Sequence, residues 1–96
     1  MSDTQLSFDA GETELARVRY LKAAGEKLRK RDLILLMLAD AHGAWVNGLS
    51  FLTGNNSQQV FVSSYSQRIG DLRKTGVPIE CRLSKNNPLG EYRLVI

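Results

Sequence analysis

Cys81 and His42, the single cysteine and the single histidine of the chain, are a candidate nucleophile and base. A cysteine nucleophile needs such a base within hydrogen-bonding reach. The two are far apart in sequence, and Cys81 falls on the inward phase of an expected strand. A small core residue is the alternative for Cys81, and a group that favours the dipole at a helix C-terminus is the alternative for His42. We favour these structural roles and expect no enzyme.

Metal and cofactor sites also lack a signature. The chain has no cluster of cysteine and histidine suited to zinc, no Walker-type or GxGxxG loop, and only singly scattered aspartates and glutamates. We expect no cofactor, no metal and no small-molecule ligand.

Positive charge is concentrated at the two ends of the sequence. Residues 1–31 hold seven Lys/Arg and five Asp/Glu, residues 32–59 hold two Asp and no Lys/Arg, and residues 60–96 hold six Lys/Arg and three Asp/Glu. The net charge is +3. Binding to nucleic acid is one explanation for this distribution, and simple solubility is the other.

The size and composition fit one compact domain in a reducing compartment. Ninety-six residues are enough for one core, and 43% of them are hydrophobic. No apolar run approaches the roughly 20 residues of a membrane span, and the polar, acidic start does not resemble a signal peptide. A lone cysteine cannot form an internal disulfide. We therefore expect a cytoplasmic protein with no membrane partner.

The first third of the chain is expected to form a leader and two helices. Residues 1–10 are predicted to be a flexible leader, and residues 11–31 an amphipathic helix that acts as a dimerisation arm or a lid. Asp32 is the predicted N-cap of a second helix ending near Gly43. This second helix is apolar on all sides, so either the preceding helix or a second subunit must cover its outer side.

The remainder, within a domain spanning 32–96, predicts smaller elements. A short strand around AWVNG and a one- or two-turn helix in LSFLTG precede a helix over 64–75. Ser64 and Gln67 have the spacing of a capping box, and Tyr65, Ile69 and Leu72 form an inward stripe. Gly76 and Pro78 end this helix. Two half-buried strands follow, with Ile79, Cys81, Leu83, Tyr92, Leu94 and Ile96 facing inward and KNNPLG as the connecting loop.

This order resembles that of the winged helix-turn-helix DNA-binding proteins. The resemblance is closest in YSQRIGDLRKTGVPIECR…GEYRL, where an Arg-Ile-x-x-Leu-Arg-Lys-x-Gly helix leads into a hairpin that ends on Tyr-Arg-Leu. It extends more loosely back to about Asp32. It implies an α+β winged helix-turn-helix fold with an additional N-terminal helix and a C-terminal hairpin as the wing.

The resemblance also implies which residues would contact DNA. Helix 64–75 would read the major groove, and wing 84–90 would contact the backbone or minor groove. The expected contacts are Ser64, Ser66, Gln67, Arg68, Gly70, Arg73, Lys74, Arg82, Lys85, Asn86, Asn87 and Arg93. The alternatives are a solvated helix face, an ordinary asparagine-rich turn, and pairing of Arg82 and Arg93 with Glu80 and Glu91 across the strands. Asp71 on the outer helix face opposes DNA binding unless it pairs with Arg68 or Lys74, or accepts a hydrogen bond from a cytosine amine.

Two further features are less specific. The densest basic cluster, residues 27–31, could contact the DNA backbone or simply end a solvated helix. Trp45 and Phe51 are expected to be core residues and not base-stacking platforms, because neither lies amid basic residues in the sequence.

The resulting functional hypothesis is a small sequence-specific protein that binds double-stranded DNA. We expect a transcriptional regulator of bacterial or mobile-element type, associated with the nucleoid and acting as a homodimer. The alternative is a winged-helix module for protein–protein interaction, such as a small inhibitor or assembly factor, without DNA binding.

Overall fold

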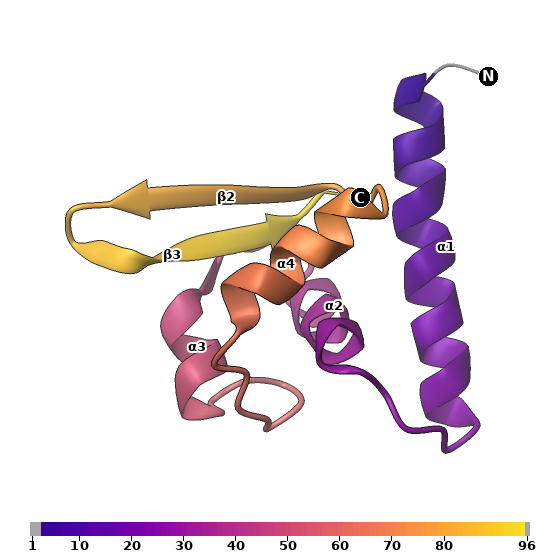
Figure 1. The fold of residues 1–96 in the computed structure, drawn as a ribbon, viewed down its shortest axis with the longest axis horizontal. Coiled ribbons are helices and arrows are strands. Elements are labelled where there is room, and N and C mark those ends of the chain that lie inside the picture. The colour runs from indigo at the N-terminus through magenta and orange to yellow at the C-terminus, as the bar shows by residue number, and fades with distance from the viewer. Residues whose placement is uncertain (1–2, 96) are drawn as a thin grey trace.

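The computed structural model describes the backbone of residues 3–95 and the side chains of residues 11–95. The described part is α+β, with four helices and a three-stranded antiparallel sheet of order β1-β3-β2 (Figure 1). This arrangement is compatible with a winged helix. The elements are α1 (Asp3–Ala23), α2 (Lys30–Asp40), β1 (Val46–Asn47), α3 (Gly48–Thr53), α4 (Tyr65–Lys74), β2 (Ile79–Ser84) and β3 (Asn87–Leu94).

The boundaries of α1 differ from those expected. The helix already begins at Asp3, so the described part of the expected leader is helical, and residues 1–2 lie outside the described residues. It ends at Ala23, because Gly25 adopts a left-handed backbone with φ of 77° that a helix cannot continue through. Residues 24–29 then connect it to α2, and Leu28 packs against the core from this connection.

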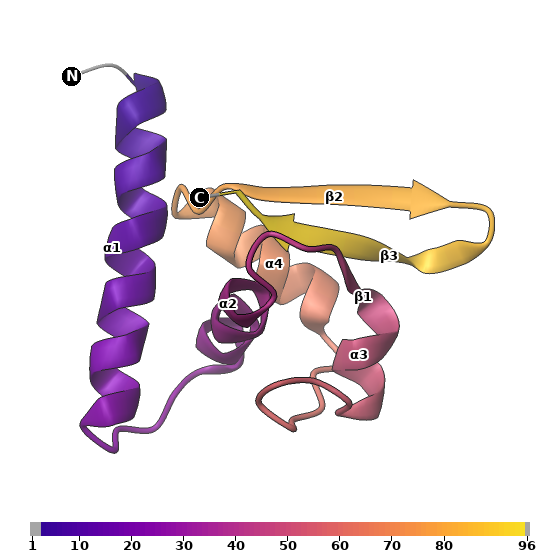
Figure 2. The ribbon, with the colours of Figure 1, turned by 180° about the vertical axis from the view of Figure 1, so that it is seen from behind.

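Helix α2 is the central element of the core. Six consecutive residues, from Ile34 to Ala39, are buried. The outer side of α2 is covered by α1, which contributes the buried Leu15 and Val18. The sequence left two possible covers for this apolar helix, the preceding helix or a second subunit. In the structure the preceding helix covers it. Figures 1 and 2 show α1 along one edge of the molecule, with its amino-terminal end extending beyond the other elements.

The start of α2 corrects the capping prediction. Arg29 occupies the N-cap position, and Asp32 lies three residues further on, in the first turn. The Asp32 Oδ2 atom accepts a hydrogen bond from the backbone N–H of Arg29 at 3.1 Å. The carboxylate thus caps the helix from inside its first turn, as a glutamate does in a capping box.

Strand β1 and helix α3 follow the expectation for this region. The Asn47 side chain caps α3 by accepting from the N–H of Leu49 at 2.9 Å, and Gly54 ends the helix with φ of 74°. Phe51 is completely buried, in agreement with its predicted core role. The connection after α3 is attached where the N–H of Val62 donates to the Phe51 carbonyl at 2.8 Å.

Helix α4 matches the predicted helix to within one residue at each end. Tyr65, Ile69 and Leu72 are buried as expected. The predicted capping box is wrong, because Ser64 occupies the N-cap position without a side-chain cap hydrogen bond. At the other end, the N–H of Val77 donates to the Leu72 carbonyl at 3.2 Å and the N–H of Gly76 donates to the Arg73 carbonyl at 3.1 Å. These two bonds form a Schellman motif, with Gly76 at φ of 97°.

The hairpin differs from the expectation in its loop and in its burial. Strand β3 begins at Asn87, so the predicted six-residue loop is reduced to a turn at Lys85 and Asn86. The register shifts between Arg82 and Ser84, and Gly90 in the bulged part of β3 has φ of 83°.

The inward phase of β2 is buried only at its first residue. Ile79 is covered, whereas Cys81 and Leu83 are exposed, so the predicted core role of both is wrong. The hairpin extends past the amino-terminal start of α4 (Figure 1), so the distal half of β2 lies beyond the helix. Tyr92 and Leu94 of β3 are buried as predicted, and Ile96 lies outside the described residues.

Candidate nucleic-acid interface

The residues of α4 divide into four sides around its axis: a buried side, the side opposite to it, and two flanks. Successive residues are rotated by about 100°, so Tyr65, Ile69 and Leu72 share the buried side. The opposite side carries Gln67 and Lys74, both exposed. One flank carries Ser66, Gly70 and Arg73 and faces the hairpin, and the other carries Arg68 and Asp71 and faces the start of α2. Buried and exposed roles thus occupy different sides of one helix.

The flank with Ser66, Gly70 and Arg73 borders a groove between α4 and the hairpin. The groove has a volume of about 330 Å³ and is also lined by Cys81, Leu83, Pro88 and Leu89. Gly70 leaves its part of the groove open, because a Cβ atom there would have no neighbour within 4 Å. The surface of α4 is therefore open to the close approach of a nucleic-acid backbone or base edge at Gly70.

The hairpin is fixed to α4 by a buried aromatic group. The rings of Phe51 and Tyr65 stack with centroids 5.3 Å apart, and Tyr92 meets Tyr65 edge-on at 5.9 Å. The hydroxyl of Tyr65 donates to the carbonyl of Leu89, in the bulged part of β3, at 2.9 Å. Sequence periodicity predicted that Tyr65 faces inward, but it could not predict this bond. The hydrogen bond from Tyr65 to Leu89 sets the position of the hairpin relative to the exposed face of α4.

The acidic residue on α4 is partly neutralised. The Asp71 Oδ2 atom lies 3.7 Å from the Arg68 Nη1 atom, one of the two partners considered for it. Arg73 and Lys74, in the last turn, are exposed. The described face therefore carries two cations and a weak ion pair, and not an isolated negative charge.

The tip of the hairpin carries the other group of predicted contacts. Lys85 and Asn86 are exposed, and Asn87 is half-buried and pairs with Ser84. Ser64, at the N-cap of α4, is half-buried. The tip thus presents a cationic and two amide side chains at the end of the hairpin farthest from α1 (Figure 1).

Arg82 and Arg93 do not lie with the other predicted contacts. Cys81 faces Tyr92 on the core side of the sheet, so the neighbouring Arg82 and Arg93 point to the outer side. Arg82 Nε bonds the carboxylate of Glu91 at 2.9 Å, and Arg93 Nη2 bonds that of Glu80 at 3.0 Å. Both arginines therefore pair with glutamates across the strands, which was the alternative to DNA contact.

The prediction that Trp45 is a core residue is wrong. Its ring is half-buried outside the core, and the guanidinium carbons of Arg82 and Arg93 lie 4.1 Å and 4.6 Å from the ring centroid. These are cation–π distances. The sequence carried no signal for this contact, because the register of the sheet brings the three residues together.

Asp32 connects the first turn of α2 to α1. Its carboxylate is buried, accepts two hydrogen bonds from the Arg29 side chain, and lies 3.1 Å from Arg17 Nη2 on α1. Burial alone would raise the pKa of this carboxyl, but the hydrogen bonds from Arg29 and the charges of Arg29 and Arg17 outweigh it. The pKa of Asp32 therefore lies below its ordinary value.

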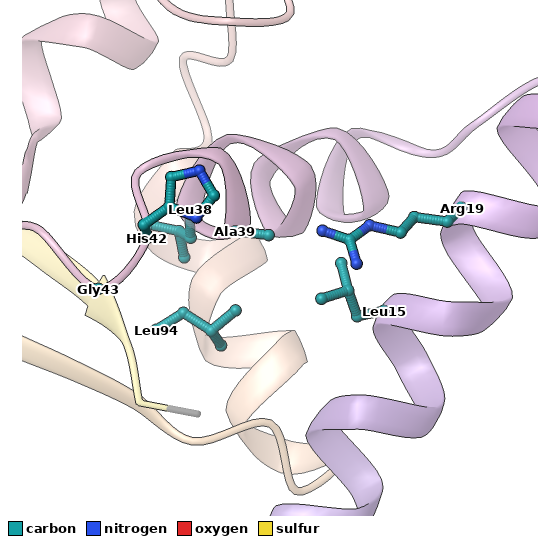
Figure 3. Close-up of a pocket in the computed structure, with 7 residues that line it drawn as sticks. All are labelled: Leu15, Arg19, Leu38, Ala39, His42, Gly43 and Leu94. Carbon is teal, nitrogen blue, oxygen red and sulfur yellow. The ribbon is translucent and has the colours of Figure 1, made fainter.

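The two candidates for nucleophilic chemistry lie at different places. Cys81 lines the groove beside α4. His42, with φ of 52°, lines a cavity of about 300 Å³ between α1, the end of α2 and the end of β3 (Figure 3). The other lining residues are Leu15, Arg19, Leu38, Ala39, Gly43 and Leu94. The two side chains therefore do not share a site.

Apolar side chains are also exposed outside the groove. Leu49 and Leu52 on α3 are 50% and 37% exposed, and Phe61 after α3 is 67% exposed. The ring of Phe61 lies over Gly54, whose Cβ position would be 3.3 Å from it. We call Leu49, Leu52 and Phe61 the α3 patch.

The described residues hold neither a metal-binding cluster nor a membrane-spanning helix. Over the described residues, no group of three or more His, Cys, Asp or Glu side chains could hold a metal ion. None of the described helices is both long enough and apolar enough to cross a membrane. No protein-family model, curated protein or solved structure matches this chain.

Proposed function

We propose that this chain is a winged-helix protein that binds double-stranded DNA in a sequence-specific manner, with α4 in the major groove. The observation that carries the proposal is the division of α4 into a fully buried side and an exposed side flanked by a fixed hairpin. A helix held in this way can enter a groove as a rigid unit, without losing its packing.

Each part of the interface has a role in this proposal. Gln67 can form a bidentate pair with adenine, and Ser66 can bond a base or a phosphate. Arg73 and Lys74 contact phosphates, and the exposed hairpin tip at Lys85 contacts the backbone or the adjacent minor groove. Arg82 and Arg93 are left out, since they bind glutamates and stack on Trp45.

The regulatory role and the oligomeric state belong to the same proposal. A cytoplasmic transcriptional regulator of bacterial or mobile-element type, with no catalytic function, would suit a domain of this size. A homodimer would present two α4 helices about 34 Å apart and read a palindrome. The amino-terminal end of α1 extends beyond the other elements and is available for such a contact (Figure 2). A monomeric mass by light scattering at micromolar concentration would contradict the dimer.

Titration of duplex DNA at several salt concentrations tests the proposal. The wild-type chain should bind at about 50 mM salt and lose affinity steeply as salt rises, with a log–log slope of several units. The double variant Arg73→Ala/Lys74→Ala should lower that slope by about one unit for each phosphate that the two side chains no longer neutralise. Absence of binding at about 50 mM salt would refute DNA binding.

A second candidate function rests on the α3 patch. Three exposed apolar residues, Leu49, Leu52 and Phe61, lie outside the groove and could contact another protein. In this case the winged-helix scaffold would act as an inhibitor or assembly factor, and α4 would remain solvated. Salt-independent affinity for a protein, abolished by Phe61→Ser but kept in Arg73→Ala/Lys74→Ala, would favour it.

A further inference from the structure

A second basic surface lies on the flank of α4 that faces away from the hairpin. The start of α2 and this flank of α4 enclose a cleft of about 400 Å³, which we call the basic cleft. It is lined by Arg29, Lys30, Arg31, Arg68 and Asp71. The sequence indicated the basic cluster before α2, but the addition of Arg68 depends on the packing of α2 against α4.

The positive charges of the basic cleft are only partly balanced. Arg29 binds Asp32, whose carboxylate also bonds Arg17, and Arg68 lies 3.7 Å from Asp71. Within residues 11–95, Lys30 and Arg31 have no salt-bridge partner. The cleft therefore carries excess positive charge and attracts an anion.

Two arginines that line the basic cleft also have a donor without an acceptor. The Nε atoms of Arg31 and Arg68, like that of Arg93 on the outer side of the sheet, are shielded from solvent, and no described residue accepts a hydrogen bond from any of the three. A shielded donor without an acceptor is costly, so such atoms in a native protein need an explanation. Both side chains are themselves partly exposed, so a rotation toward an oxyanion in the cleft would supply the acceptors. The positive end of the α2 dipole would add to the attraction of the anion.

The position of the basic cleft indicates which anion it binds. Ser66, Gly70 and Arg73 on one flank of α4 face the hairpin, and Arg68 and Asp71 on the other face the cleft. A helix in the major groove, which is about 12 Å wide, has one DNA backbone on each side. The hairpin would lie beside one backbone and the basic cleft beside the other.

We infer that the basic cleft binds a backbone phosphate of duplex DNA, on the strand opposite the one that the hairpin contacts. The inference rests on the proposed function and extends it, because it assigns a phosphate contact to Arg31 and Arg68. The cleft and the hairpin together would fix the depth and direction of α4 in the groove, without reading bases themselves.

Two glutamine variants and duplexes with single neutral methylphosphonate linkages test this contact. Arg31→Gln and Arg68→Gln should each bind duplex roughly tenfold more weakly and lower the log–log salt slope by about 0.9. The matched control is Arg19→Gln, an exposed arginine on α1 away from the cleft, which should change neither quantity. At one position of the duplex, replacing the phosphate by a methylphosphonate should weaken binding of the wild-type chain but should not weaken binding of Arg31→Gln any further. Suppose that both cleft variants keep the affinity and the salt slope of the wild type and unfold at the same temperature. That result would overturn the inference, while DNA binding itself would stand.

Inorganic phosphate separates failure of the cleft from failure of the proposed function. In NMR spectra of the isotopically labelled chain, millimolar phosphate should shift the Nε–H signals of Arg31 and Arg68, and chloride at equal ionic strength should not. Arg31→Gln should abolish the shift at Arg68. If the wild-type chain binds no duplex, the DNA assignment of the cleft fails together with the proposed function. Phosphate shifts that persist in that case would show an anion site of another purpose.

Discussion

Two glycines near the hairpin should respond in opposite ways to the same substitution. Gly48 begins α3 and is buried, and a Cβ atom there would lie 2.5 Å from the carbonyl oxygen of Leu89 and 2.9 Å from the hydroxyl of Tyr65. Gly70 lies within α4, and a Cβ atom there meets nothing within 4 Å. Gly48→Ala should therefore destabilise the fold, and Gly70→Ala should stabilise it.

The size of each effect follows from these surroundings. Ordinary contact begins at 3.4 Å, so at Gly48 the backbone of Leu89 would have to move by about 0.9 Å. Such overpacking costs about 1–3 kcal/mol, and loss of the Tyr65 hydrogen bond adds about 1 kcal/mol. The greater helix propensity of alanine offsets up to about 1 kcal/mol, which leaves a net cost of about 2 kcal/mol. At Gly70 only the helix propensity acts, and the expected gain is about 0.5–1 kcal/mol.

Urea unfolding followed by far-ultraviolet circular dichroism measures both free energies. The two variants should differ by about 3 kcal/mol, which separates their midpoints by at least about 1 M urea. Equal stability of Gly48→Ala and wild type would refute the close approach of α3 to the bulged part of β3. A Gly70→Ala variant destabilised as much as Gly48→Ala would refute the open surface on α4.

The remaining predictions concern other contacts of the same fold. Because the pKa of Asp32 is lower in the folded state, its contribution is present above about pH 4 and disappears as pH falls through the folded pKa. Asp32→Asn should thus cost on the order of 1–2 kcal/mol in urea unfolding at pH 7 and less at pH 3; an equal cost at both would contradict the ionised pair. Tyr65→Phe should cost about 1 kcal/mol and raise amide exchange in the hairpin, and Tyr92→Phe, whose hydroxyl is 3.4 Å from the same carbonyl, should cost less. Arg82→Gln and Arg93→Gln should leave the salt slope of DNA binding unchanged, and a drop would return them to the interface.

The sequence predicted the elements whose periodicity and end signals agree. In α4, the inward stripe of Tyr65, Ile69 and Leu72 and the exit at Gly76 specify one helix with one buried side, and the structure has both. The burial of α2 was likewise predictable, because a helix that is apolar on all sides must be covered on all sides. These parts depend on local chain properties.

The features that could not be predicted depend on tertiary arrangement. Alternation marked Cys81 and Leu83 as inward, and they are on that phase, but the hairpin extends past the core and leaves them exposed. Trp45 lies beside two arginines because of the sheet register, which a sequence pattern does not specify. The basic cleft likewise needs the packing of α2 on α4 to bring Arg31 and Arg68 together.

The most direct test of DNA binding through α4 is an NMR titration of the isotopically labelled chain with duplex DNA at low salt. The proposal predicts that the largest amide shifts occur at Gln67, Gly70 and Lys74 on α4 and at Lys85 in the hairpin turn, with little change at Phe61. Shifts confined to Leu49, Leu52 and Phe61 of the α3 patch, or no shifts at all, would contradict it.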